Sequence, residues 1–382
     1  MYTRQLSTKL IDSIEKMPVV TILGPRQSGK TTLAKMCFPE IKYYNLEDPE
    51  TRLFAIEDPR GFLGQADKMI LDEIQKTPEL LSYIQVMVDE NKNKKFILTG
   101  SHQLLLNEKI SQSLAGRTRI LTLLPLSFSE LYTNTQVPSL DECIINGFYP
   151  RIHNDKISPQ DWIPSYIQTY VEKDVRQITN IGDQIAFDRF LHLSAGRAGQ
   201  LLDFTSLGKD IGITSPTVKS WISILCSGYI CFMLKPFYTN INKRHIKTAK
   251  LFFYDTALLC NLLGIKTIGH LNTHPLRGAI FENFIIAEFM KSEFNKGNNP
   301  QFYFYNDNHQ REIDLIDANN IDLKLFEIKS GATFQPKWID SLNWFCKQNN
   351  KDFDKNIIFT GTGSKTFDKT SIHNWEFLIK SL

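Results

Sequence analysis

The segment VVTILGPRQSGKTTLAKMCF, residues 19–38, constrains the fold more than any other part of the chain. A β-branched apolar run leads into a loop that matches G-x-x-x-x-G-K-[ST], and a helical pattern follows. In such a loop, backbone N–H groups and the positive end of a helix surround phosphate oxygens. We therefore expect a strand, a phosphate-binding loop and a helix. The predicted nucleotide-binding residues are Gly24, Pro25, Arg26, Gln27, Ser28, Gly29, Lys30, Thr31 and Thr32.

Two side chains of this loop have specific predicted roles, and a second segment supplies the rest of the site. Lys30 would reach the β- and γ-phosphates of ATP, and the Thr31 hydroxyl would ligate Mg²⁺. In KMILDEIQ, a buried-strand run ends in Asp72 and Glu73, at the end of a strand where open α/β sheets bind ligands. Asp72 would hold Mg²⁺ through water, and Glu73 would orient the attacking water. The alternative is two solvated acids.

A third strand pattern, KKFILTGS, ends in Thr99 and Ser101. Either hydroxyl is a candidate sensor of the γ-phosphate, and an ordinary turn is the competing interpretation. Arg117 follows a helical stretch and precedes an apolar strand, a position from which an arginine reaches the γ-phosphate of a neighbouring subunit. Arg119 is a weaker candidate for this role, and structural ion pairing is the alternative for both. An arginine that acts in trans requires a homo-oligomer.

Five apolar runs are separated by helical or loop patterns: 19–23, 41–45, 69–72, 96–99 and 120–124. This spacing predicts a parallel α/β sheet with crossover helices. At 382 residues the chain is too long for one ordinary core, and two to four domains are expected.

Composition excludes several classes of protein. With 42% hydrophobic residues and a net charge of +3, the chain is neither disordered nor a polybasic nucleic-acid coat, so any basic surface must be local. The N-terminus lacks an apolar signal region, and no apolar run reaches the roughly 20 residues that span a bilayer. We expect a cytoplasmic protein with no membrane partner. The six scattered cysteines form no CxxC pair and are expected to be reduced core thiols.

The motifs GPRQSGKTTL, MILDEIQKTPELL, ILTGSHQLLL and SLAGRTRILTLLPLSFSEL, with the C-terminal features described below, resemble the prokaryotic AAA+ ATPases that carry a C-terminal domain of unknown function. The resemblance covers nearly the whole chain. It implies an AAA+ module of the archaeal-ATPase and origin-recognition kind, followed by a winged helix and a nuclease-like fold. It implies no settled biological role.

The middle of the chain predicts a helical lid and then a winged helix. Helical spacing of apolar residues begins near WIPSYIQTYVEKDVRQI, and Tyr166, Tyr170, Val171, Val175 and Ile178 share one face. Further on, a helix, a turn at Gly212 and a second helix follow one another, with Ser215 as the expected N-cap and Pro216 as the first helical residue.

The second of these helices and the basic stretch after it predict contact with DNA. Thr217, Lys219 and Ser220 would face a major groove, and a basic wing would contact phosphates. The wing residues are Lys243, Arg244, Lys247 and Lys250. The alternative is that the winged helix only packs on the ATPase.

The C-terminal part places acids on apolar elements. Glu282 shares the apolar stripe of an expected helix, Asp314 lies in a predicted hairpin, and LFEIKSG supplies Glu327 and Lys329. Three carboxylates suit Mg²⁺ or Mn²⁺, and a lysine can stabilise a pentavalent phosphate. This order resembles the PD-(D/E)XK nuclease superfamily. A same-face salt bridge between Glu327 and Lys329 is the alternative.

The expected fold class is thus α/β: a P-loop AAA+ parallel sheet with a helical lid, a winged helix-turn-helix and a C-terminal α/β PD-(D/E)XK nuclease-like domain. The expected boundaries are 1–145 for the ATPase core, 146–184 for the lid, 185–265 for the winged helix and 266–382 for the nuclease-like domain. The predicted function is ATP-dependent action on DNA with Mg²⁺- or Mn²⁺-dependent cleavage. The alternative is a non-cutting nucleotide-dependent switch that binds DNA or protein partners.

Overall fold

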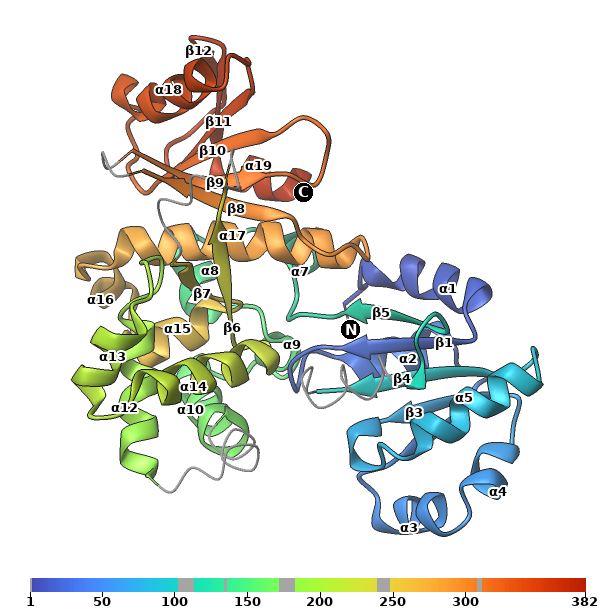
Figure 1. The fold of residues 1–382 in the computed structure, drawn as a ribbon. Coiled ribbons are helices and arrows are strands. Elements are labelled where there is room, and N and C mark those ends of the chain that lie inside the picture. The colour runs from blue at the N-terminus through green and yellow to red at the C-terminus, as the bar shows by residue number, and fades with distance from the viewer. Residues whose placement is uncertain (1, 102–112, 134–135, 172–182, 239–247, 308–310) are drawn as a thin grey trace.

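The computed structural model describes residues 2–101, 113–133, 136–171, 183–238, 248–307 and 311–382 (Figure 1). Its N-terminal unit is built on a five-stranded sheet with the order β2-β3-β4-β1-β5. All neighbouring strands in it are parallel, as predicted. The strands are β1 Val19–Leu23, β2 Lys42–Asn45, β3 Lys68–Asp72, β4 Lys95–Gly100 and β5 Thr118–Thr122.

Helices cover both faces of this sheet because its central strands are apolar on both sides. On one face, Val20 and Ile22 of β1 pack with Leu10 of α1. On the other face, Val19 and Leu23 belong to a larger core that includes α5. The helical elements of this unit are α1 Leu6–Lys16, α2 Lys30–Cys37, α3 Pro49–Glu57, α4 Pro59–Gly64, the 3₁₀ turn η1 Ile74–Lys76 and α5 Leu80–Glu90.

The fifth strand was expected at 120–124 and is found at Thr118–Thr122. Parallel pairing sets this register, since Thr118 stands opposite Val19 and Thr122 opposite Leu23. Leu123 and Leu124 are buried beyond the strand, which explains why apolarity alone placed the strand two residues too late.

The middle of the chain is mainly helical, and Figure 1 shows it beneath the C-terminal strands and beside the N-terminal unit. Two of its helices begin with complete capping boxes, Ser127 with Glu130 and Ser139 with Glu142. The elements are α7 Phe128–Tyr132, α8 Leu140–Asn146, α9 Pro150–Asn154, α10 Pro159–Tyr166, the π-helical turn η2 Ile167–Val171, α12 Gln184–Ala195, α13 Phe204–Ile211, α14 Ser215–Ser227, α15 Thr256–Leu262 and α16 Ile268–Thr273.

A second sheet has eight strands in the order β12-β13-β11-β10-β9-β8-β6-β7. The antiparallel hairpin β6–β7 follows α14, and β6 also pairs in parallel with β8 through Lys235 and Pro236. One sheet therefore joins the predicted winged helix to the C-terminal strands. The strands are β6 Cys231–Pro236, β7 Lys250–Phe253, β8 Phe302–Asn306, β9 Glu312–Asp317, β10 Lys324–Lys329, β11 Asp354–Phe359, β12 Lys365–Phe367 and β13 Thr370–Asn374.

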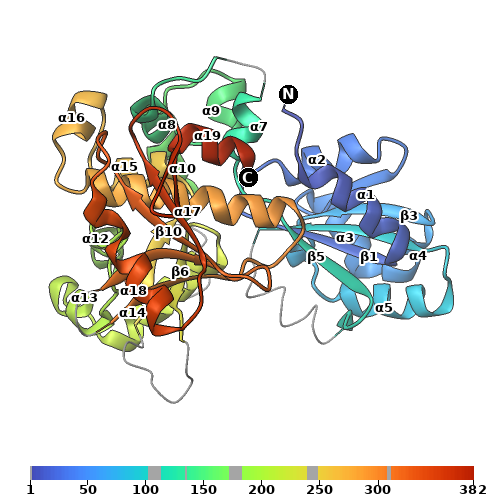
Figure 2. The same ribbon diagram turned by 90° about the horizontal axis from the view of Figure 1, so that it is seen from above.

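Helix α17, Arg277–Asn295, connects the parts of the molecule. Figure 2 shows it running from the helical and C-terminal part towards the N-terminal unit. Asn283 is fully buried on it and exchanges two hydrogen bonds with the backbone of Phe253 in β7. The remaining C-terminal elements are the 3₁₀ turn η3 Pro336–Ile339, α18 Asp340–Gln348 and α19 Trp375–Ser381. Among the described residues, no helix is long and apolar enough to cross a membrane.

Candidate nucleotide site and C-terminal acid–lysine cluster

A cavity of about 510 Å³ lies at the carboxyl edge of the first sheet, where the loop after β1 leads into α2. This is the edge at which parallel α/β sheets bind ligands. Six of the predicted loop residues line the cavity: Arg26, Gln27, Gly29, Lys30, Thr31 and Thr32. Asp72 and Glu73 also line it, so the two predicted halves of the site meet.

Two glycines allow the loop to take this path. A Cβ on Gly24 would stand 2.0 Å from the carbonyl oxygen of Leu123, and Gly29 has φ +94°, a left-handed conformation that L side chains rarely adopt. Lys30 follows Gly29 as the first residue of α2. Its ammonium donates to the carbonyl oxygens of Gly24 at 3.0 Å and Pro25 at 2.8 Å. Burial lowers the pKa of Lys30, and the charges of Glu73 and Asp72 oppose that shift.

The carboxylate of Asp72 is the centre of a hydrogen-bond network. The Thr31 hydroxyl donates to it at 2.9 Å, the Tyr43 hydroxyl donates at 2.8 Å, and the Thr99 hydroxyl donates to its Oδ1. Burial and the nearby Asp72 charge raise the pKa of Tyr43, which keeps this phenol a donor. The network aligns the end of β3 with the first turn of α2.

Glu73 adopts a left-handed backbone conformation, with φ 56° and ψ 49°. This conformation is unfavourable for a side chain larger than glycine, and such strain is often kept at ligand and active sites. The Glu73 N–H donates to the Thr99 hydroxyl at 3.1 Å, so Thr99 holds both acids. Ser101 donates to the Glu73 carboxylate at 3.2 Å, and Gln75 also donates to it. Contact of Thr99 or Ser101 with a γ-phosphate stays a prediction.

One wall of the cavity was not predicted from the sequence. Helix α9 and its C-cap supply Pro150, Arg151, Asn154 and Asp155. Arg151 and Asp155 form an ion pair at 3.2 Å. The sequence offered one signal, a glycine at 147 followed by Pro150, which begins α9.

The predicted lid also reaches the loop. Tyr166, at the end of α10, donates from its hydroxyl to the Arg26 carbonyl at 3.3 Å. Tyr170 and Val171 belong to η2, whereas Val175 and Ile178 lie outside the described residues.

Arg117 lies at the opposite edge of the sheet from the cavity, next to the amino end of β1, where its carbonyl accepts from Val19 N–H. Its guanidinium makes two hydrogen bonds of 2.7 Å to the Asp89 carboxylate. This position excludes contact with the cavity of the same chain, and a role in trans stays a prediction. Arg119 donates to the Gly297 carbonyl at 3.4 Å.

The two helices predicted on either side of Gly212 are α13 and α14, with Gly212 in the left-handed conformation between them, and their role as a DNA-binding helix-turn-helix stays a prediction. The predicted N-cap was wrong by one residue: the Thr214 side chain accepts from Thr217 N–H, and Ser215 is the first helical residue. Lys219 and Ser220 are exposed and Thr217 is half-buried. Of the predicted wing, Lys243, Arg244 and Lys247 lie outside the described residues.

The placement of Lys250 on the basic wing was wrong. This side chain is only 5% exposed and pairs with Glu282 of α17 at 3.1 Å and with Glu312 of β9. Burial would lower the pKa of Lys250, but the charges of Glu282, Asp314 and Glu312 raise it. Burial and the neighbouring acids raise the pKa of Glu282 to about 7, although Lys250 opposes the shift. A lysine inside an acidic pocket cannot contact DNA phosphates.

The other predicted acids gather around Lys329 at the end of β10. Its ammonium contacts Asp314 at 3.0 Å and also contacts Glu327. Burial would raise the pKa of Asp314, but Lys329 and Lys250 hold it below its usual value. We name these six residues the acid–lysine cluster: Lys250, Glu282, Glu312, Asp314, Glu327 and Lys329.

In this structure the acids of the acid–lysine cluster are ion-paired with lysines, and a three-carboxylate metal site there stays a prediction. Within the part of the chain that the structure describes, no three His, Cys, Asp or Glu side chains are arranged to hold a metal ion. Glu282 is paired with Lys250, while Asp314 and Glu327 are paired with Lys329. Two lysines therefore pair with the three acids that were predicted to need a divalent cation.

Three family models match separate parts of the chain. A model described as an AAA domain matches residues 16–132. Two models described as domains of unknown function, DUF8612 and DUF4143, match residues 137–268 and 277–377.

Two curated relatives are the uncharacterized proteins Mb2031c of Mycobacterium bovis and Rv2008c of Mycobacterium tuberculosis. Each is 27% identical over 339 residues, covering 86% of this chain and 74% of the relative. Among solved structures, the Walker-type ATPase PABY2304 of Pyrococcus abyssi is 16% identical with a TM-score of 0.47, covering 69% of this chain and 96% of its own. AMPPCP-bound DnaA from Aquifex aeolicus is 12% identical with a TM-score of 0.31, and the match covers 57% of this chain and 85% of the DnaA chain.

The matched AAA domain includes β1, the phosphate-binding loop, α2 and the acids after β3. These are the parts from which an AAA-type nucleotide site is built. The AAA-domain match over residues 16–132 supports ATP binding and hydrolysis by the N-terminal unit.

Proposed function

We propose that ATP binding and hydrolysis in the N-terminal unit control the action of the rest of the chain on duplex DNA. The observation that carries this proposal is the cavity itself, where Lys30, Thr31, Asp72 and Glu73 share one lining. At this point lie a cation, a hydroxyl, a carboxylate of the kind that binds Mg²⁺ and a second acid. This is the set that ATP hydrolysis requires.

The residues at this point fit Mg²⁺. Thr31 Oγ1 lies 2.9 Å from Oδ1 of Asp72 and 3.0 Å from its Oδ2, and hydroxyl and carboxylate oxygens are the ligands that Mg²⁺ prefers. When bound, Mg²⁺ would neutralise charge on the β- and γ-phosphates. Lys30 would exchange its two carbonyl acceptors for phosphate oxygens. Glu73, held by Ser101 and Gln75, would orient the attacking water.

Helix α14 supports DNA as the partner. It is the second helix of a helix-turn-helix, the element that enters the major groove in such proteins. Lys219 and Ser220 are exposed on its first turns, where base and phosphate contacts are usually made. The alternative remains a packing role, because Trp221 and Leu225 of the same helix are buried against the core.

The binding of duplex DNA at several salt concentrations, with and without a non-hydrolysable ATP analogue, tests this function. Lys219→Gln combined with neutralisation of Lys243, Arg244 and Lys247 should reduce the slope of log K against log salt. The expected reduction is roughly 0.9 for each DNA phosphate that the variant no longer neutralises. The analogue should change DNA affinity in wild type and not in Lys30→Ala. An unaltered slope together with no nucleotide effect would contradict the DNA part of the proposal.

A second candidate function, metal-dependent DNA cleavage, is favoured by one specific observation. Helix α17 is followed by the meander β8–β9–β10, then by α18 and by β11, which pairs in parallel with β10. This is the order of elements expected for a PD-(D/E)XK-like unit, and it places Asp314, Glu327 and Lys329 in contact. The present ion pairs would have to open before a metal could bind.

Calorimetric titration of Mn²⁺ into the full chain separates these candidates. If the chain cleaves DNA, wild type should bind Mn²⁺ more tightly than Asp314→Asn. Wild type should also cut plasmid DNA, and Lys329→Met should not. Equal Mn²⁺ binding by wild type and Asp314→Asn, without cutting, would leave the acid–lysine cluster as a structural feature of a non-cutting switch.

A further inference from the structure

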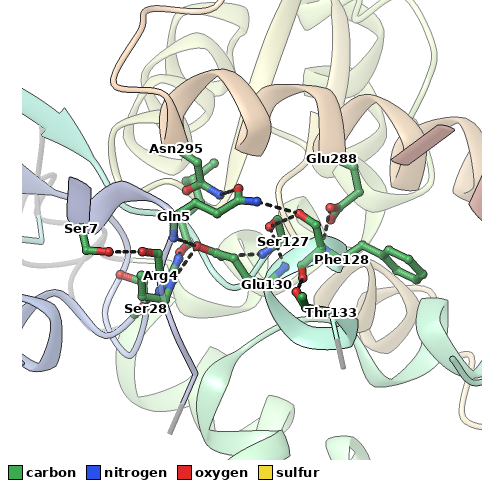
Figure 3. Close-up of polar contacts among 12 residues, drawn as sticks. Arg4, Gln5, Ser7, Ser28, Ser127, Phe128, Glu130, Thr133, Glu288 and Asn295 are labelled. Atoms are coloured by element: carbon green, nitrogen blue, oxygen red, sulfur yellow. Dashed lines mark hydrogen bonds and ion pairs between the residues drawn. The ribbon is translucent and has the colours of Figure 1, made fainter. Parts of the chain in front are cut away.

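Arg4 lies beneath the phosphate-binding loop, although it precedes α1 and is far from the loop in sequence. It is 7% exposed. Its Nη1 donates to the Ser28 carbonyl at 2.7 Å, its Nη2 to the Leu124 carbonyl at 2.8 Å, and its Nε to Oε1 of Glu130 at 3.1 Å. Figure 3 shows the Arg4 side chain between Ser28 and Glu130. One guanidinium thus joins the loop, the segment after β5 and helix α7.

The Ser28 contact fixes the orientation of one peptide group in the loop. In a trans peptide, the carbonyl and the following N–H point in opposite directions. Because the Ser28 carbonyl is held by Arg4, the Gly29 N–H is directed away from Arg4. Gly29 lines the nucleotide cavity and is the N-cap of α2. Its N–H belongs to the set of backbone donors that such loops offer to phosphate oxygens.

Glu130, the carboxylate partner of Arg4, has hydrogen-bond partners for both of its oxygens. Glu130 also accepts from Gln5 N–H at 2.8 Å and from Ser127 N–H at 2.9 Å, so both carboxylate oxygens have partners. Its side chain is fully buried. A buried ion pair persists only when its remaining polar atoms are satisfied, as they are here.

Helix α17 also contacts the residues around Glu130. Phe128 N–H, at the start of α7, donates to Oε2 of Glu288 at 2.7 Å, and Glu288 pairs with Lys291 at 2.7 Å. Asn295 donates to the Gln5 side chain at 3.1 Å. Figure 3 shows Asn295 and Glu288 descending from α17 to these partners. Through Glu130 and α7, Arg4 therefore links the loop to α17, the helix that carries Glu282.

We propose that Arg4 is a positioning residue for nucleotide binding: it holds the Ser28–Gly29 peptide in the orientation that presents the Gly29 N–H to the phosphates of ATP or ADP. The proposal rests on the proposed nucleotide site. Arg4 does not line the cavity, so it would act on the nucleotide through the loop backbone.

The test uses the full chain and a fluorescent ATP analogue, with Kd, KM, kcat and the thermal midpoint measured together. Arg4→Lys keeps a positive charge beside Glu130, but one ammonium cannot reproduce the planar fork that reaches three acceptors. We expect Kd and KM to rise by roughly tenfold or more, as for the loss of one charge-assisted hydrogen bond. The value of kcat at saturating ATP should change little. Arg60→Lys, at an exposed arginine of α4, is the matched control and should bind like wild type.

A lower thermal midpoint with unchanged Kd would give Arg4 a structural role only and would overturn the proposal. Should Arg4→Lys fail to fold, Glu130→Gln provides the second variant, because its amide keeps an acceptor oxygen for Arg4 without the charge. We expect a smaller rise in Kd for Glu130→Gln, and an unchanged Kd in that folded variant would overturn the proposal. If wild type itself binds no nucleotide, both this proposal and the proposed function fail, whereas equal binding by wild type and Arg4→Lys removes this proposal alone.

Discussion

The Thr31 hydroxyl donates to Oδ1 of Asp72 at 2.9 Å, although the two residues are 41 positions apart in the chain. Thr31 belongs to the first turn of α2, and Asp72 ends β3. Parallel pairing brings these elements to the same edge of the sheet, so the hydroxyl and the carboxylate are positioned together before a nucleotide arrives. Prior positioning reduces the ordering that ligand binding would otherwise require.

Thr31→Val should weaken the Mg²⁺-dependent part of ATP binding by about tenfold or more, because valine keeps the shape of threonine and removes the oxygen. Binding measured in the presence of a chelator should change little, and this serves as the internal control. The measurement is titration of a fluorescent ATP analogue with and without Mg²⁺. An equal gain in affinity from Mg²⁺ in wild type and variant would exclude Thr31 as a ligand.

Arg117→Ala should keep ATP binding and lose hydrolysis if this arginine acts on a neighbouring subunit, by a factor on the order of 10³ to 10⁵. Asp89→Asn is the matched control, since it breaks the same exposed ion pair and leaves the arginine in place. The assay is phosphate release, repeated with Arg117→Ala mixed with Glu73→Gln. Restored activity in the mixture supports the role in trans, and a fully active monomer argues against it.

Lys250→Met should destabilise the protein by about 1 to 3 kcal/mol, because it leaves the partly buried Glu282 without its cation and beside the half-exposed Glu312. Adding Glu282→Gln should recover part of that loss, since one of the two unpaired charges is then removed. Lys324→Met, at an exposed lysine on β10, is the control. Denaturant unfolding measures the three variants. An unchanged free energy of unfolding for Lys250→Met would show that the ion pairs contribute little.

His153 of α9 should make stability fall in acid. Burial lowers its pKa, although its hydrogen bond to the Gly147 carbonyl opposes the shift. The unfolded chain binds a proton near pH 6.5 and the folded chain does so only at lower pH, so stability is lost as the pH falls below about 6.5. The slope is at most about 1.4 kcal/mol per pH unit.

His153→Gln can still donate to Gly147 and does not titrate. Unfolding experiments between pH 5 and pH 8 should therefore show a smaller loss of stability in acid for this variant than for wild type. Parallel curves for the two proteins would remove His153 as the cause.

The nucleotide half of the site could be predicted because its signals are local. The strand at Val19–Leu23 was found where it was expected, and Asp72 and Glu73, at the end of the apolar run at 69–72, line the cavity. Parallel strands that end at one edge bring such residues together without further information.

Arg4 and Lys250 could not be placed in this way. Arg4 pairs with Glu130 across 126 positions, and Lys250 pairs with Glu282 across 32. Periodicity reports which face of an element is apolar, but it does not report which distant charge a buried side chain will meet. A lysine in a basic segment therefore suggested a surface, while the fold placed it among acids.

We propose that Lys30 and Glu73 act in one ATP site with separate roles. Titration of a fluorescent ATP analogue, combined with phosphate release, tests it most directly in wild type, Lys30→Ala and Glu73→Gln. Lys30→Ala should lose ATP affinity, whereas Glu73→Gln should bind ATP like wild type and hydrolyse it roughly 10² to 10⁴ times more slowly. Unchanged binding by Lys30→Ala, or undiminished hydrolysis by Glu73→Gln, would contradict this account.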